Sequence, residues 1–149
     1  MRHLGDLTKL RGSKIELVDV VTFGSPCQDL SVAGKRAGLG GGRSGLFLEA
    51  VRIIKEMREA TCGAYPAFAI WENVPGAFTS NKGEDFRTVA EEIARVAQPG
   101  ISVARPKKWP NAGAIVGKGQ SLAWRLLDAR HCRLCQKQKS GNKCDTITR

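Results

Sequence analysis

The stretch "VDVVTFGSPCQDLSVAGKRAGLGGGRSGLF", residues Val18–Phe47, contains the features that decide the fold. A run of β-forming residues ends at Phe23, and the tetrapeptide "GSPC", ending in Cys27, follows it. Glycine recurs through residues 34–45. A short run rich in β-branched residues and ended by Gly-Ser-Pro is typical of a buried strand. The sequence therefore places a cysteine at the end of an apolar strand, at the start of a long glycine-rich loop.

The segments around this stretch alternate between two patterns. Buried strands are predicted over Ile15–Phe23 and Ala67–Val74, and amphipathic helices over Ser44–Ala60, with Ser44 as its N-cap, and Gly83–Ala97. In the first helix we expect an apolar stripe of Leu46, Ala50, Ile53, Ile54 and Met57. Strands that alternate with helices predict an α/β fold with a parallel sheet and right-handed crossovers. In such sheets, ligands bind beyond the carboxyl ends of the strands.

The composition is that of a globular chain of 149 residues, 42% of them hydrophobic. No apolar run reaches the roughly 18–20 residues that span a bilayer, and "MRHLGDLTKL" is not a secretion signal. We therefore expect a cytoplasmic protein without membrane contact. Five cysteines, an odd number, argue against a disulfide framework in such a chain.

The net charge of +10 is unevenly distributed. Residues 1–104 have a net charge of +1, whereas residues 105–149 carry eleven Lys and Arg against two Asp, a net charge of +9. A basic tail on a balanced body favours contact with a polyanion, most simply nucleic acid. A solvated tail without a partner is the alternative, and charge alone does not separate the two.

Two residues, Cys27 and Glu72, are candidates for chemistry at the carboxyl edge of the predicted sheet. A cysteine beside a strand is often an inert core residue, but the polar loop after Cys27 favours an accessible thiol. Glu72 stands inside the apolar run "AIWENV", where burial would raise its pKa and favour a role in proton transfer. The alternative for Glu72 is a strand-end carboxylate that faces solvent or caps the next helix.

Taken together, these motifs closely resemble the cytosine-5 DNA methyltransferase family. The resemblance rests on Pro-Cys-Gln (Pro26–Gln28), Arg-Ser-Gly-Leu-Phe (Arg43–Phe47) and Glu-Asn-Val (Glu72–Val74). It also includes "GDLT" (Gly5–Thr8) and the helix that begins near "NKGEDFRTV". The ordered set covers about Leu4 to Arg95 and is far more specific than a lone Pro-Cys pair.

The resemblance implies a partial, doubly wound, Rossmann-like methyltransferase domain that uses S-adenosyl-L-methionine on double-stranded DNA. It implies that Cys27 attacks carbon 6 of a flipped-out cytosine and that Glu72 stabilises the base during methyl transfer to carbon 5. The glycine-rich loop would close over the base. Residues that the resemblance assigns to the substrate are Pro26, Gln28, Ser31, Arg43 and Asn73. Residues that it assigns to the cofactor are Asp6, Leu46 and Phe47.

Several family features have no counterpart in the sequence. The glycine-rich cofactor motif, the acidic ribose-binding residue, the target-recognition region and the last helix are not found. We expect residues 1–98 to form a partial catalytic domain, and residues 99–149 to be an irregular basic segment with a linker over 98–118 and a helix over 119–130. The chain is then expected to be a truncated copy of a phage or mobile-element gene. It should be inactive alone, unless a complementing polypeptide supplies the missing motifs.

The tail "HCRLCQKQKSGNKC" allows a different interpretation. It offers His131, Cys132, Cys135 and Cys144, which are ligand types for tetrahedral zinc. The spacing is irregular, and we therefore assign no metal ligand among the site residues. The alternative function is a non-catalytic, basic nucleic-acid adaptor with a zinc-stapled tail, which a zinc measurement on purified protein would distinguish.

Overall fold

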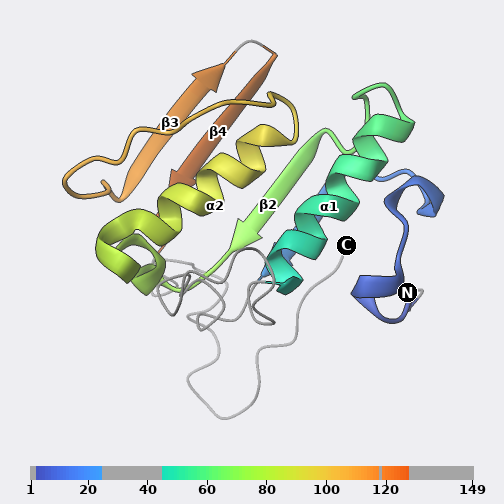
Figure 1. Cartoon of the computed structure of the whole chain (residues 1–149), viewed down its shortest axis with the longest axis horizontal. Helices are drawn as coiled ribbons and strands as arrows, with labels where there is room; N and C mark the ends of the chain where they lie inside the picture. The colour runs from blue at the N-terminus through green and yellow to red at the C-terminus, as the bar shows by residue number, and fades with distance from the viewer. Residues whose placement is uncertain (1–2, 25–44, 118, 128–149) are drawn as a thin grey trace, which may run out of the picture.

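The computed structural model describes residues 3–24, 45–117 and 119–127, and these form a mixed α/β structure (Figure 1). The strands are β1 (Val20–Gly24), β2 (Phe68–Glu72), β3 (Ala112–Gly117) and β4 (Gln120–Arg125). The α-helices are α1 (Gly45–Ala60) and α2 (Glu84–Arg95). Short 3₁₀ turns are η1 (Leu7–Lys9), η2 (Gly12–Lys14), η4 (Pro75–Phe78) and η5 (Ser80–Gly83). Among these described residues, none of the helices has the length and apolar character needed to cross a membrane.

The predicted parallel sheet is confirmed by the pairing of β1 with β2. Val20 is opposite Phe68 and Gly24 is opposite Glu72, so the two strands end together. The first strand begins later than the predicted Ile15. Pairing starts where the Phe68 N–H donates to the Asp19 carbonyl at 2.9 Å, and the residues before Asp19 lie beyond the amino end of β2. An extended segment becomes a β-strand only when its backbone groups pair with a neighbouring strand. Residues 15–18 have no such neighbour within the described chain.

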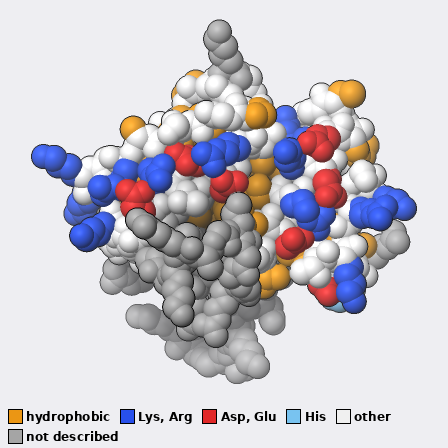
Figure 2. Space-filling view, in the orientation of Figure 1, with side chains coloured by type: hydrophobic (Ala, Val, Ile, Leu, Met, Phe, Trp, Pro, Cys, Tyr) orange, Lys and Arg blue, Asp and Glu red, His pale blue; other side chains and the backbone are white. Residues whose placement is uncertain are grey.

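One face of the β1–β2 pair packs against both helices. Phe23 and Trp71, which are opposite each other, contact a buried cluster of Phe47 and Val51 from α1 and Val89 from α2. In α1 the buried residues are Phe47, Val51, Ile53, Ile54 and Met57, whereas Leu46 is exposed, so the predicted stripe was wrong at its start. Acidic and basic side chains alternate along the outer surfaces of both helices (Figure 2). Both helices are therefore amphipathic, as expected.

The opposite face of the same strand pair is apolar and exposed. Val20 is 44%, Phe68 65% and Ile70 53% exposed, and all three project from this face because side chains alternate along a strand. The preceding Leu17 and Val18 are exposed as well. Parallel sheets in proteins are normally covered on both faces. The described residues therefore cover one face of this sheet and leave the other face exposed.

The predicted helix over 119–130 is wrong, because residues 120–125 form β4 and pair with β3 in an antiparallel hairpin. Leu122 and Trp124 point to the same side, two residues apart, and pack on Phe86 of α2. This two-residue period prevails over the helical propensity of "SLAWRLL". The expected linker over 98–118 likewise contains β3, and it contributes Trp109 to the same buried cluster. Residues 99–149 were expected to be irregular, but the part of them that the structure describes contains a hairpin that packs on α2.

A buried carboxylate fixes the segment between α2 and the hairpin. Glu91 is 5% exposed and accepts a hydrogen bond from the Val103 N–H at 2.9 Å. It also forms ion pairs with Arg87 at 2.7 Å and Arg95 at 3.1 Å. Burial raises the pKa of Glu91, but the Val103 hydrogen bond and the two guanidinium groups outweigh it and hold this pKa below its ordinary range. The ionised form of Glu91 therefore stabilises the fold.

We predict that Glu91→Gln lowers the free energy of unfolding at neutral pH by about 1–3 kcal/mol, because Arg87 and Arg95 lose a charged partner. A carboxyl whose pKa is lowered in the folded state loses its contribution as the pH falls below the ordinary value of 4.5. The stability gap between wild type and variant should therefore close between about pH 5 and pH 3 in chemical denaturation. Glu92→Gln is the control, because Glu92 lies on the same helix and its one ion pair among the described residues is with Arg95; it should show a much smaller gap. A gap that does not change with pH would contradict the prediction.

Candidate active site

Glu72 lies at the carboxyl end of β2, directly opposite Gly24 at the end of β1. A Cβ atom placed on Gly24 would lie 3.7 Å from Glu72 Oε2 and 3.4 Å from the Glu72 carbonyl oxygen. The carboxylate of Glu72 therefore lies beside the last residue of β1, from which the chain continues to the Pro-Cys-Gln motif. Glu72 is exposed, so the expectation of a buried carboxylate is wrong and the alternative of an exposed strand-end carboxylate holds. Alternation along β2 explains this, because Trp71 takes the buried side.

The next residue, Asn73, turns the chain away from the sheet. Its Oδ1 accepts a hydrogen bond from the Val74 N–H at 2.8 Å, and η4 begins immediately afterwards at Pro75. The Glu-Asn-Val motif thus occupies the end of a strand and the turn after it, at the edge where the sequence predicted the site.

Five predicted site residues lie outside the described residues: Pro26, Cys27, Gln28, Ser31 and Arg43. The tail residues proposed as zinc ligands, His131, Cys132, Cys135 and Cys144, lie outside them as well. Within the described ranges, no group of three or more His, Cys, Asp or Glu side chains could hold a metal ion. The roles of these nine residues stay predictions.

Asp6 caps the first turn of the chain, η1. Its Oδ1 accepts hydrogen bonds from the Thr8 N–H at 3.0 Å and the Thr8 hydroxyl at 2.8 Å. The side chain is exposed, and in the described structure both of these bonds end on the same oxygen. An exposed carboxylate with one occupied oxygen is a suitable acceptor for an amino group of a ligand.

The turn that carries Asp6 is fastened to α1 by an ion-pair network. Arg52 donates to the Leu10 carbonyl at 3.0 Å and to the Leu7 carbonyl at 3.5 Å, and it forms ion pairs with Glu56 at 2.5 Å and Glu49 at 2.6 Å. Glu56 in turn accepts the Gly12 N–H at 2.7 Å. The hydrogen bonds from Arg52 and Gly12 lower the pKa of Glu56 below its ordinary range. Sequence analysis missed this network, although the three- and four-residue spacing of its charges on one helix was a signal for it.

Gly12 brings the N-terminal segment into backbone contact with α1. A Cβ atom on Gly12 would lie 2.2 Å from the Ile53 carbonyl oxygen and 2.8 Å from Glu56 Cβ. Only glycine fits at this distance, because neither the helix backbone nor a Cβ atom can move aside. The position of the Asp6 turn therefore depends on Gly12 and the network around Arg52.

The remaining two cofactor candidates differ in their surroundings. Leu46 is exposed at the start of α1, whereas Phe47 is 5% exposed and contacts the rings of Phe23 and Trp71, with centroids 6.1 and 6.2 Å away. Phe47 is thus part of the core that positions β1 and β2, and only a small part of it can touch a ligand. Cofactor contact by either residue stays a prediction.

Comparison with known proteins agrees with this arrangement of motifs. The family model of the C-5 cytosine-specific DNA methylases matches residues 2–97. The chain belongs to this family. Members of the family take their methyl group from S-adenosyl-L-methionine.

Individual methylase relatives are phage and bacterial proteins. A DNA N-6-adenine-methyltransferase of Escherichia phage P1 is 31% identical over 92% of this chain and 21% of its own length. The orphan methyltransferase M.SPRI of Bacillus phage SPR is 35% identical over 63% of this chain and 20% of its own length. The type II methyltransferase M1.ScrFI of Lactococcus lactis subsp. cremoris is 40% identical over 60% of this chain and 21% of its own length. The chain thus spans about a fifth of the length of these relatives.

We predict that Gly12→Ala lowers the free energy of unfolding by about 1–3 kcal/mol, because the added methyl group overlaps the backbone of α1. Hydrogen exchange should show the largest loss of protection over residues 7–14. Gly45→Ala, where no heavy atom lies within 4 Å of the added Cβ, is the matched control and should leave stability unchanged or slightly higher. Equal stability of the Gly12 variant and wild type would show that the segment does not contact α1 as closely as described.

Proposed function

We propose that this methylase acts on double-stranded DNA and transfers a methyl group to carbon 5 of cytosine. The observation that carries the proposal is the location of the Glu72 carboxylate beside the end of β1, three residues before Cys27 in the sequence. Three residues span at most about 11 Å, so the thiol and the carboxylate are constrained to one end of the strand pair. The family match supports the reaction type.

In the proposed mechanism, Cys27 as a thiolate adds to carbon 6 of the cytosine ring. Glu72 binds ring nitrogen 3 and the exocyclic amine and stabilises the charge that develops in the ring. Its exposed position at the strand end leaves room for a flipped-out base. S-adenosyl-L-methionine, when bound, supplies the methyl group for carbon 5. Loss of the carbon 5 proton then lets the bond to Cys27 break.

The described residues fit part of this cofactor. Asp6 offers an exposed carboxylate to the adenine amino group, and Arg52, Glu56 and Gly12 hold its turn in place. We propose that Asp6, Leu46 and Phe47 line the cofactor site, and that Pro26, Gln28, Ser31, Arg43 and Asn73 contact the substrate.

Adenine methylation is the second candidate, because the phage P1 relative carries that activity in its name. The cysteine argues against it for this chain. An exocyclic amine is itself a nucleophile, whereas carbon 5 of cytosine becomes one only after a nucleophile has added to carbon 6. A Pro-Cys-Gln motif is therefore useful for cytosine methylation and dispensable for adenine methylation.

The experiment is a chimera of M1.ScrFI in which the 89 residues of this chain that match replace the corresponding segment. We predict methylated DNA from the chimera, with 5-methylcytosine as the product in nucleoside mass spectrometry. Cys27→Ser should abolish it, and Glu72→Gln should lower the rate by about 10²–10³ because a charge-stabilising group is lost. N6-methyladenine, or activity that survives Cys27→Ser, would overturn the proposal. The chain alone should give no methylated DNA.

We further propose that the described elements belong to a doubly wound, Rossmann-like sheet completed by a complementing polypeptide. The support is the exposed apolar face of Val20, Phe68 and Ile70, together with the greater length of the relatives. A layer of helices over this face would remove it from water, as in other parallel sheets. DNA as substrate is in keeping with the cytoplasmic location expected from the sequence.

We predict that Phe68→Lys with Ile70→Lys lowers the binding of a hydrophobic dye and the self-association of the chain, with little change in its melting temperature, because both side chains are mostly exposed. In the chimera, the same double variant should lose activity through failed assembly of the two layers. Val116→Lys, at an apolar position of β3 that is 82% exposed, is the control and should change none of these measurements. A double variant that assembles and methylates normally would contradict the proposed cover.

A further inference from the structure

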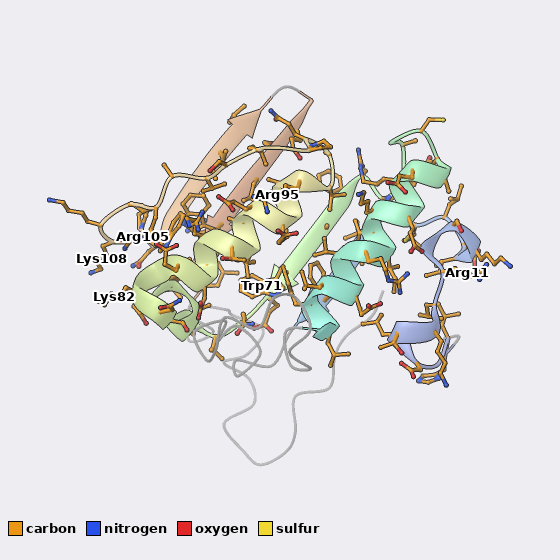
Figure 3. All side chains as sticks on the ribbon, in the orientation of Figure 1. Arg11, Trp71, Lys82, Arg95, Arg105 and Lys108 are labelled. Carbon is orange, nitrogen blue, oxygen red and sulfur yellow. The ribbon has the colours of Figure 1, made fainter. Side chains whose placement is uncertain are left out.

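Three lysines to which the proposed function gives no role lie near the start of α2: Lys82 in η5, and Lys107 and Lys108 in the segment that leads to β3. All three are exposed, and none forms an ion pair within the described structure. Figure 3 shows Lys82, Arg105 and Lys108 at the same end of the molecule, and Figure 2 shows basic side chains gathered there. We refer to Lys82, Lys107 and Lys108 as the lysine cluster.

The acidic groups near the lysine cluster already have partners. Glu84 is paired with Arg87 at 2.7 Å and with Arg105 at 2.6 Å. Asp85 is 2% exposed and accepts hydrogen bonds from Ser80 and from Asn81. The positive charge of the three lysines is therefore not compensated by these carboxylates.

Lys82 has a backbone conformation that lysine rarely adopts. Asn81, Lys82 and Gly83 have φ of 46°, 55° and 86°, three consecutive residues in the left-handed region. Asparagine and glycine tolerate this region, but a lysine there is strained and persists only when its surroundings fix it. Backbone strain at a residue without a packing role points to a function for its side chain.

Contacts from the segment before β3 fix this turn. Arg105 donates to the Lys82 carbonyl at 2.9 Å, and the Trp109 indole donates to the Gly83 carbonyl at 2.9 Å. A Cβ atom on Gly83 would lie 2.9 Å from the Trp109 ring, so the indole closes directly over the turn. Lys107 and Lys108 lie between these two donors in sequence. The same contacts that hold Lys82 in its strained conformation thus bring the other two lysines to the same surface.

The lysine cluster is on the side of the molecule that carries the candidate active site. The chain that leaves the carboxyl end of β2 at Glu72 passes through η4 and η5 to Lys82 within ten residues (Figure 1). Ligands of a parallel sheet approach from the carboxyl ends of the strands. A long anionic substrate that reaches Glu72 would therefore extend toward the cluster.

We infer that the lysine cluster binds backbone phosphates of the duplex next to the target base, a contact that rests on the proposed function. Three hydrated ammonium groups on an open surface suit a row of phosphates, because each acts as a point charge and needs no pocket. Such contacts fix the position of the enzyme on DNA and carry no sequence information.

The test is the salt dependence of binding to a short duplex, measured by fluorescence anisotropy on the whole chain between about 50 and 200 mM salt. In the cluster variant, Lys82→Asn is combined with Lys107→Gln and Lys108→Gln, and asparagine keeps the left-handed conformation accessible. Each lost phosphate contact makes the slope of log affinity against log salt shallower by about 0.9, so we expect a change of about 2–3. The control variant, Lys9→Gln with Lys14→Gln and Lys55→Gln, removes the same charge from the N-terminal segment and α1 and should change the slope little.

The outcomes separate this inference from the proposed function. Equal slopes for wild type and the cluster variant, with DNA still bound, would overturn the inference and leave the proposed function intact. Equal changes in the cluster and control variants would overturn it too, because net charge alone would then explain them. Wild-type protein that binds anionic vesicles but no duplex would overturn both.

Discussion

Trp71 is the side chain on which the arrangement of this molecule depends. It contacts Phe47 on one side and Phe86 on the other, with ring centroids 6.2 and 6.3 Å away, and it packs against both hydrophobic clusters. One indole thereby joins β2 to both helices, and Figure 3 shows it between α1 and α2. Phe86 in turn contacts Trp124 of the hairpin, with ring centroids 5.7 Å apart. Since side chains alternate along a strand, the packing of Trp71 against the two clusters also fixes which way its neighbour Glu72 faces.

The elements with a single strong pattern could be predicted from the sequence, and those that depend on a partner could not. The helical period of residues 44–60 predicts α1, and the apolar run before Gly24 predicts β1. Both patterns are local, so they can be recognised without knowing which element packs against them. The segment "SLAWRLL" fits both the helical and the strand period, so the sequence alone predicts a helix where the structure has β4. Its pairing with β3 and the packing of Trp124 on Phe86 decide between them, and both are long-range contacts.

The candidate site likewise combines features that the sequence predicts with features that only the structure shows. The order of the motifs predicted the edge at which Glu72 lies, yet its exposure is set by register, since its neighbour takes the buried side of β2. The anchoring of Asp6 by Arg52 and the left-handed turn at Lys82 arise from residues far apart in sequence. Local patterns therefore identified the chemical groups, whereas the contacts that hold them required the structure.

The attachment of residues 7–14 to α1 has a consequence for dynamics. This segment buries only Gly12 and is held by a carboxylate and a guanidinium rather than by apolar side chains. Gly12 nevertheless lies against Ile53 and Met57 of α1, so opening of this segment would uncover part of the helix that it packs on. A ligand that binds Asp6 selects the molecules in which this segment is closed on α1. Its apparent affinity is then governed partly by Arg52 and Glu56, which need not touch it.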